Sequence, residues 1–296
     1  MSRLNNNGYI KSPMNYIGGK YRILNQILPL FPDNINCFLD LFAGGCNVAV
    51  NVSANRIICN DILFYIIDLY TYFKNTNIDI LLKEIDRIIE FYSLSLTNEQ
   101  GYKTLREDYN KTKNPLLFFA LICYSFNHQI RYNNSHMFTT PFGKERSRYN
   151  DTIKNNLIRF VESIQNKHVE LSSLNFKQFD YSFLTPQDFV YCDPPYLITV
   201  GSYNDGKRGF EGWSAKEESN LLNLLDELND KNIKFALSNV LYHKGKVNEI
   251  LLEWVNKRKY NIHYLSMNYS NSSYHSANTN DTSSVEVLIT NYDKKQ

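Results

Sequence analysis

The sequence lacks three features that would each define a class of protein: a strong net charge, a long apolar run and a cysteine framework. Its 32 Lys and Arg nearly balance its 30 Asp and Glu, so the formal charge at pH 7 is only +2. That balance excludes a uniformly basic nucleic-acid coat, although a local basic surface remains compatible with it. The longest strongly apolar run, PLLFFALICYSF from Pro115, is too short to span a bilayer, and no signal-peptide pattern precedes the first motif. We therefore expect no membrane location.

The cysteines and histidines show no spacing that is typical of a metal site. No C-x-x-C pair occurs, and most of the cysteines stand inside apolar runs, which predicts buried, reduced thiols in a cytoplasmic protein. The sequence therefore gives no reason to expect a metal cofactor. The cysteines are Cys37, Cys46, Cys59, Cys123 and Cys192.

The chain is long enough, and with 43% hydrophobic residues apolar enough, to bury a large core. It shows no internal repeat and no low-complexity linker, so it is either one domain with an insertion or two domains. Charge is uneven along it, because residues 101–170 hold 11 Lys and Arg against 6 Asp and Glu, a local balance of +5. The middle of the chain is therefore basic.

The hydrophobic pattern predicts an α/β sheet interrupted by helices. INCFLDLFAGG (35–45) predicts a buried strand that runs into a glycine turn, NVAVNVSAN (47–55) predicts a helix, and RIICND (56–61) predicts the next strand. This order is the opening of a doubly wound α/β sheet, in which ligands lie at the carboxyl ends of the strands.

Helical periods then fill the chain from Ile62 to about Lys167, and the α/β pattern resumes at His168. We therefore predict an α/β domain formed by residues 1–65 and 168–296, and a helical domain formed by residues 66–167. Later strands are expected at 188–193, 233–239, 261–267 and 283–292, with helices at 214–231 and near 246–254, a loop at 202–213 and a mobile loop at 268–284.

Two glycine-containing segments precede the helical interval. DLFAGGCN (40–47) supplies a strand-end acid and two glycines that let the backbone approach a ligand closely, and Asp61 follows where such sheets hold a ribose hydroxyl. NYIGGKYRIL (15–24) lacks the spacing of a nucleotide P-loop and is better suited to bring Lys20 and Tyr16 to a ligand. A purely structural turn, a helix N-cap at Asp61 and a solvated Lys20 are the alternatives.

VYCDPPY (190–196) is the most specific motif. Its two prolines fix φ at about −65° and remove two N–H donors, so the turn is rigid and the Pro194 carbonyl has a set direction. Asp193 and that carbonyl can both accept hydrogen bonds from one amino group, whose nitrogen then faces an electrophile, while Tyr196 offers a ring for stacking. The arrangement suits methylation of a base amino group, with a structural Pro-Pro turn as the alternative.

Together these motifs resemble the Dam-like D12 class of adenine-N6 DNA methyltransferases, which use S-adenosylmethionine. The resemblance extends over nearly the whole chain and includes the order of the motifs. It implies a Rossmann-like methyltransferase sheet with a mainly helical target-recognition insertion. It implies catalytic roles for Asp193, Pro194, Pro195 and Tyr196. The cofactor-binding residues that it implies are Tyr16, Lys20, Asp40, Phe42, Gly44, Asp61 and Asp193.

The resemblance continues into the insertion, where FNHQIRYNNSHMFTTPFGK (126–144) is similar to the family's DNA-reading segment, with Thr139 where the family commonly has Asn. By this likeness Arg131 would contact a guanine edge, and nearby cations would neutralise phosphates. A solvated basic loop is the alternative. The implied DNA-binding residues are Asn127, Arg131, Asn133, Pro141, Lys144, Arg146 and Arg148.

The resemblance implies a site-specific enzyme that flips an adenine out of duplex DNA and transfers a methyl group in line to N6 without a metal. Its role would be Dam-like or part of restriction-modification, with a restriction endonuclease as a further partner. An RNA adenine methyltransferase and a catalytically silent DNA-binding subunit are the rival hypotheses.

Overall fold

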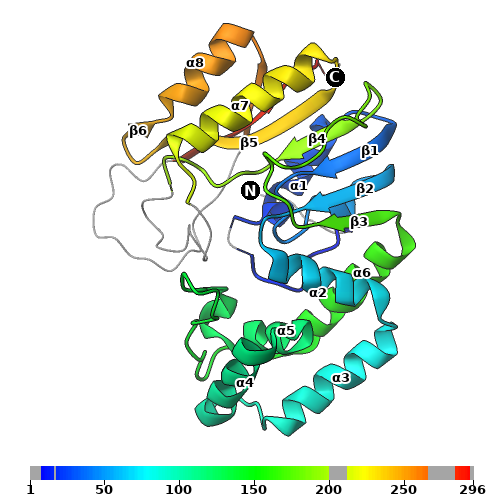
Figure 1. Ribbon diagram of the computed structural model, residues 1–296, viewed down its shortest axis with the longest axis vertical. Helices are drawn as coiled ribbons and strands as arrows, with labels where there is room; N and C mark the ends of the chain where they lie inside the picture. Colours follow the sequence, from blue (N-terminus) through cyan, green and yellow to red (C-terminus); the bar gives the residue numbers. More distant parts are fainter. Residues whose placement is uncertain (1–7, 17, 200–211, 266–283, 294–296) are drawn as a thin grey trace, which may run out of the picture.

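A twisted sheet forms the centre of the molecule in the computed structural model, which describes residues 8–16, 18–199, 212–265 and 284–293 (Figure 1). Within those ranges the strand order is β3-β2-β1-β4-β5-β8-β7, and the short β6 pairs with β5. The strands are β1 (Ile35–Asp40), β2 (Ala54–Asn60), β3 (Val169–Ser172), β4 (Phe189–Cys192), β5 (Lys234–His243), β6 (Lys246–Val247), β7 (Asn261–Leu265) and β8 (Ser284–Thr290).

Strands β1 to β5 run parallel, whereas β8 pairs antiparallel with both β5 and β7. The order reverses between β1 and β4, because the chain proceeds from β1 outward to β2 and β3 and returns to β4 on the other side of β1. Such a switch point leaves a crevice at the carboxyl ends of the two strands. The structure confirms the predicted doubly wound α/β sheet.

Helices cover both faces of the sheet (Figure 1). In chain order they are η1 (Lys20–Ile23), α1 (Leu24–Ile27), η2 (Leu28–Leu30), η3 (Ala49–Asn51), α2 (Phe64–Asn75), α3 (Ile78–Phe91), α4 (Glu99–Thr112), α5 (Pro115–Tyr124), η4 (Phe126–His128), α6 (Asp151–Asn166), α7 (Ala215–Asp230) and α8 (Glu249–Arg258), where η marks 3₁₀ helices. Figure 1 shows α2 to α6 gathered below the sheet and α7 and α8 above it.

The helix predicted over residues 47–55 is wrong. Only the single turn η3 forms there, and β2 already begins at Ala54. Three of the residues, Val48, Val50 and Val52, are β-branched and lose side-chain freedom in a helix. The segment that returns from the end of β1 to the start of β2 therefore contains only this one 3₁₀ turn.

Two apolar cores lie on opposite faces of the sheet, because successive side chains of a strand alternate between its faces. Phe38 and Tyr191 belong to the core beneath the sheet, whereas Leu39 and Val190 belong to the core under α7 and α8. All five cysteines are buried free thiols, as predicted. Among the described residues no helix is both long and apolar enough to cross a membrane.

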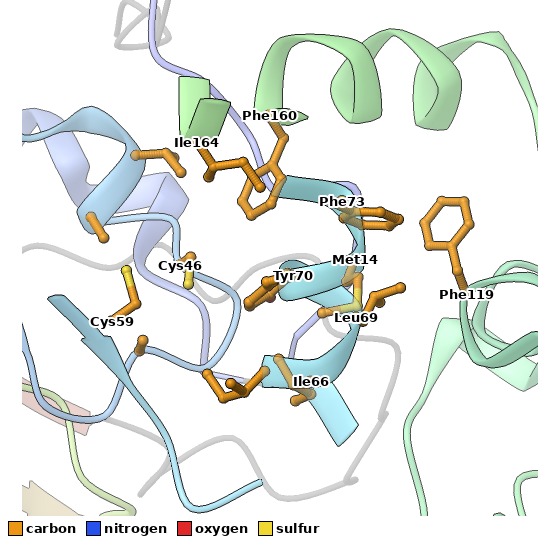
Figure 2. Packing of buried hydrophobic residues seen from close by; sticks show 14 of the residues in the cluster. Met14, Cys46, Cys59, Ile66, Leu69, Tyr70, Phe73, Phe119, Phe160 and Ile164 are labelled. Atoms are coloured by element: carbon orange, nitrogen blue, oxygen red, sulfur yellow. The ribbon is translucent and has the colours of Figure 1, made fainter. Parts of the chain in front are cut away.

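The lower core continues without a break from the sheet into the helical insertion. The ring of Tyr70 on α2 lies 5.2 Å from that of Phe160 on α6, and Phe73 on α2 lies 5.5 Å from Phe119 on α5 (Figure 2). Asn114 caps α5 and Pro115 occupies its first turn, which starts this almost wholly buried helix at a defined point. The division at residues 66 and 167 stays a prediction.

Replacement of Phe73 by Ala removes a fully buried ring from this shared core. We expect the free energy of unfolding to fall by about 3–5 kcal/mol, because the lost ring leaves a cavity that the surrounding side chains fill only in part. Phe91→Ala is the matched control, since that ring is 79% exposed and should change the stability by no more than about 0.5 kcal/mol. Urea denaturation followed by circular dichroism measures the stability of both variants. Equal losses would contradict the assignment of Phe73 to the shared core.

Candidate functional site

A cavity of about 310 Å³ opens at the carboxyl ends of β1, β2 and β4, next to the switch point. All ten residues that the sequence singled out for cofactor binding and catalysis line its wall, although they come from four segments spread over 181 positions. They are Tyr16, Lys20, Asp40, Phe42, Gly44, Asp61, Asp193, Pro194, Pro195 and Tyr196. The structure thus brings the set together, and the role of each member stays a prediction.

The glycine turn after β1 forms one side of the cavity. Gly44 adopts a φ of +46°, a conformation that side chains other than glycine rarely take, and a Cβ there would stand 2.7 Å from Cε1 of Tyr16. The Gly44 N–H donates to Asp61 Oδ2 at 2.8 Å, and the Tyr70 hydroxyl donates to the Gly44 carbonyl at 2.9 Å. Both the backbone conformation and the close approach of Tyr16 therefore require glycine.

Asp61, directly after β2, holds two backbone N–H groups and faces the cavity, while its predicted role at a ribose stays a prediction. Its Oδ1 accepts from the Leu63 N–H at 2.9 Å, just before α2, while Oδ2 holds the Gly44 N–H. The carboxylate also lines the cavity and is 8% exposed. Asp61 therefore ties the start of α2 to the glycine turn while it faces the site.

Asp40, at the end of β1, is the member of the site with unused bonding capacity. Its side chain is buried, and Oδ1 has no hydrogen-bond partner among the described residues. Burial raises the pKa of Asp40 well above its ordinary value, and the nearby charges of Asp193 and Asp61 add to the rise. A buried oxygen without a donor is costly, so a ligand with a cationic or N–H group fits this part of the wall.

Lys20 is buried in the wall, which excludes the solvated lysine that the sequence left open. Its Nζ lies 2.8 Å from Asp193 Oδ2 and 3.5 Å from Glu286 Oε1, and it donates to the Gly18 carbonyl at 2.8 Å. Burial lowers the pKa of Lys20, but the charges of Asp193 and Glu286 outweigh it and raise the pKa above its ordinary value. The lysine is therefore held as an ammonium ion.

Asp193 follows β4 directly and is 18% exposed to the cavity. Its Oδ2 faces Lys20, and its Oδ1 accepts from the Tyr196 hydroxyl at 3.0 Å. Burial raises the pKa of Asp193, and the ammonium of Lys20 opposes that rise. Burial also raises the pKa of Tyr196 well above its ordinary value, so its hydroxyl keeps its hydrogen and acts as a donor.

Trp213 closes another side of the cavity, in contact with two further rings. It lies edge-on to Phe42 at 5.7 Å and 5.8 Å from Phe176, and its Nε1 donates to Glu218 at 2.6 Å. The sequence placed this residue at the end of the 202–213 loop, of which residues 202–211 lie outside the described residues, as do residues 268–283.

The segment resembling a DNA-reading element forms a hairpin beside the cavity. Tyr132 and Phe138 face each other across it, and Tyr132 stacks on Tyr65 of α2 at 3.9 Å. The Asn15 side chain donates to the Asn127 carbonyl at 3.3 Å, which joins the hairpin region to the N-terminal segment of the site. Buried aromatic rings thus fix this hairpin to α2.

Most of the predicted DNA-binding residues point outward from this hairpin region. Asn133 also accepts from the Ser135 and Met137 N–H groups, so part of its role is to close the turn. Arg146 donates to Asn127 Oδ1 at 3.3 Å and lies over the Phe126 ring at 4.8 Å. Arg131 is partly buried, whereas Asn127, Asn133, Pro141, Lys144, Arg146 and Arg148 are exposed.

The family model for the D12 class N6 adenine-specific DNA methyltransferases matches residues 16–271, a range that includes the cavity, the hairpin and the DPPY motif. The chain belongs to this family. The family implies S-adenosylmethionine as the methyl donor, and the unpartnered oxygen of Asp40 fits the cationic ammonium of that cofactor.

The chain is 53% identical to the type II methyltransferase M.FokI of Planomicrobium okeanokoites, over 97% of this chain and 43% of that protein. It is 49% identical to the modification methylase StsI of Streptococcus sanguinis, over 97% of this chain and 44% of that protein. It is 26% identical to the DNA adenine methylase of Escherichia coli strain K12, over 76% of this chain and 79% of that protein. The chain thus spans less than half the length of the first two relatives.

Glu286 is the site residue that the sequence reasoning missed. It lies on β8, is 1% exposed, and places Oε1 3.0 Å from the Tyr196 hydroxyl and 3.5 Å from Lys20 Nζ. A signal was available, because Glu286 interrupts the apolar run SSVEVLITNY and a fully buried acid nearly always has a partner. The partner itself could not be identified from the strand alone.

Gly44→Ala should weaken the binding of S-adenosylmethionine about tenfold, or about 1.4 kcal/mol. The new Cβ would push against Tyr16 and would be strained at a φ of +46°. Isothermal titration calorimetry measures the affinity. Gly8→Ala is the matched control, because Gly8 also has a positive φ, of +126°, but a Cβ there meets no atom within 4 Å. Equal losses in the two variants would show that backbone strain alone is responsible.

Proposed function

We propose that this chain is a site-specific DNA adenine-N6 methyltransferase that transfers a methyl group from S-adenosylmethionine to an adenine flipped out of duplex DNA. The observation that carries the proposal is the convergence of Asp193 and Tyr196 with the Gly44 turn and Asp40 in one cavity, beside an anchored hairpin with exposed basic residues. A binding subunit without activity would need no buried Lys20–Asp193 pair in that cavity.

The cofactor would lie along the glycine turn. Asp40 would accept a hydrogen bond from its ammonium group, Asp61 would hold the ribose, and Phe42 and Tyr16 would pack against it, all from positions in the cavity wall. S-adenosylmethionine supplies an electrophilic methyl group on its sulfonium sulfur. Net negative charge in the wall, where Lys20 stands among Asp40, Asp61 and Asp193, favours such a cation.

Asp193 would orient the target amino group and stabilise the positive charge that develops on its nitrogen. Its Oδ2 is already fixed by Lys20, so Oδ1 is the oxygen that would accept the amino hydrogen. The Pro194 carbonyl would be the second acceptor, and the two prolines offer no N–H that could compete for it. Catalysis would then come mainly from positioning, with Tyr196 as the ring against the flipped base.

Duplex DNA would lie across the hairpin, with Arg131 and Asn133 at base edges and Lys144, Arg146 and Arg148 at phosphates. This assignment is supported by the exposure of Lys144, Arg146 and Arg148 and by the contact of the hairpin region with Asn15 near the cavity. The Arg146 guanidinium is held over Phe126, which limits the side-chain entropy that binding would cost.

The biological role that we propose is modification in a bacterial restriction-modification system, inside the cell and together with an endonuclease that acts on the same sequence. Two relatives named as a type II methyltransferase and a modification methylase support this role. No metal is required by the proposed transfer, because Asp193 and the prolines provide the polar groups that position the nucleophile.

Asp193→Ala should lower kcat for methyl transfer by at least about a hundredfold and leave the fold intact, because it removes the acceptor for the amino group. The assay measures label transferred from S-adenosylmethionine to unmethylated duplex DNA, with RNA as a parallel substrate. Asp180→Ala is the control, since that carboxylate is exposed and outside the cavity. Label in RNA alone would replace the proposal by an RNA methyltransferase, and DNA binding without label would favour the silent subunit.

Lys144→Ala should weaken binding to all duplex sequences and lower the slope of log affinity against log salt by about 1, because one phosphate contact is lost. Fluorescence anisotropy over a range of salt concentrations measures that slope. Lys257→Ala is the matched control, since Lys257 is an exposed lysine on α8, across the sheet from the hairpin (Figure 1). An unchanged slope in Lys144→Ala would remove this residue from the DNA contact.

A further inference from the structure

Glu286 is a buried acid that lies behind the cavity wall. Its neighbours Val285 and Val287 belong to the core under α7 and α8, so Glu286 points to the other face, as does Leu288. It pairs with Val240 of β5, where the register of β5 on β8 shifts between Val240 and Tyr242. Such an irregularity re-aims a side chain, and here it occurs next to an acid that faces the catalytic motif.

Glu286 has two functional neighbours that it shares with Asp193. Its Oε1 lies 3.5 Å from Lys20 Nζ and 3.0 Å from the Tyr196 hydroxyl, while Asp193 contacts the same ammonium at 2.8 Å and the same hydroxyl at 3.0 Å. Two carboxylates thus compete for one ammonium and one phenol. A buried acid paired this way is expensive to maintain, and an apolar residue would suit the strand better.

The competition has a consequence for the catalytic carboxylate. Tyr196 has one hydroxyl hydrogen and two carboxylate oxygens at 3.0 Å, so it donates fully to only one of them at a time. Donation to Asp193 takes up part of the accepting capacity of Oδ1, the oxygen that the target amino group needs. Donation to Glu286 leaves that oxygen open.

We propose that Glu286 is a positioning residue for the methyl transfer: it takes the Tyr196 hydrogen bond when the amino group binds Asp193, and with Asp193 it keeps Lys20 in the wall. The proposal rests on the proposed function. Glu286 itself does not line the cavity among the described residues, so it acts through Tyr196 and Lys20 and not through contact with the base.

The groups around Asp193 predict that changes at Glu286 and at Tyr196 shift the pKa of Asp193 in opposite directions. Asp193 is faced by Lys20 from η1, Asp40 from β1, Glu286 from β8, and Tyr191, Cys192 and Tyr196 from its own segment. Burial raises the pKa of Asp193, Lys20 lowers it, the charge of Glu286 raises it, and the hydrogen bond from Tyr196 lowers it. Loss of the Glu286 charge should therefore lower that pKa, and loss of the Tyr196 hydroxyl should raise it.

The test is the pH dependence of single-turnover methyl transfer by the full chain, with saturating S-adenosylmethionine and duplex DNA. Glu286→Gln should lower the rate about tenfold or more, because the neutral amide is a weaker acceptor than the carboxylate and Tyr196 then donates mainly to Asp193 Oδ1. It should also move the acid limb of the profile, where Asp193 becomes protonated, to lower pH. Tyr196→Phe should move the same limb to higher pH. In the Tyr196→Phe background, Glu286→Gln should cost much less rate, because no hydroxyl is left to compete.

The matched control is Glu170→Gln, which removes an acid from β3 whose partner is Arg56, outside the cavity. Its rate and profile should equal those of the parent chain. A folded Glu286→Gln variant with the parental acid limb would overturn the proposal, as would equal rate losses with and without the Tyr196 hydroxyl. If Glu286→Gln does not fold, the Tyr196→Phe variant decides. The proposal is then overturned when the acid limb of that variant does not move to higher pH. A parent chain that methylates no DNA would instead refute the proposed function.

Discussion

The buried ion pair between Lys20 and Asp193, with Nζ and Oδ2 2.8 Å apart, joins segments that are 173 positions apart in the sequence. Removing Lys20 would leave the acids Asp193 and Glu286 without their cation, which is far more costly than the loss of a surface pair, whereas Lys20 keeps Glu286 as a partner when Asp193 is removed. The pair therefore commits the N-terminal segment to the end of β4. The glycine turn, Tyr16 and the DPPY motif meet in one cavity as a consequence.

The sheet supplies the other constraint on the site. Because the strand order reverses between β1 and β4, Asp40 and Asp193 follow neighbouring strands and face the same crevice. Burial raises the pKa of Asp40 and the charge of Asp193 adds to that rise, while Lys20 lowers the pKa of both acids. The remaining negative character is suited to a cationic cofactor, so the same electrostatic arrangement serves both the fold and the ligand.

The helical insertion is attached to this site by apolar packing. A continuous core runs from Phe38 and Tyr191 in the sheet through α2 to Phe119 and Phe160, and Tyr132 of the hairpin stacks on Tyr65 of the same helix. Close-packed rings cannot shift without displacing their neighbours. The hairpin is therefore held at a set distance from the DPPY motif.

The sequence by itself determined the features whose constraints are local. The prolines after Asp193, the glycine turn after β1 and the acids at strand ends follow from backbone geometry and hydrophobic period, and the structure places all of them in one cavity. The same local reasoning failed at residues 47–55, where the return to β2 leaves room for one turn only. The partners of Glu286 and the unpartnered oxygen of Asp40 could be identified only from the tertiary structure. Their surroundings depend on which strands pair and in which register, and those contacts join residues far apart in the chain.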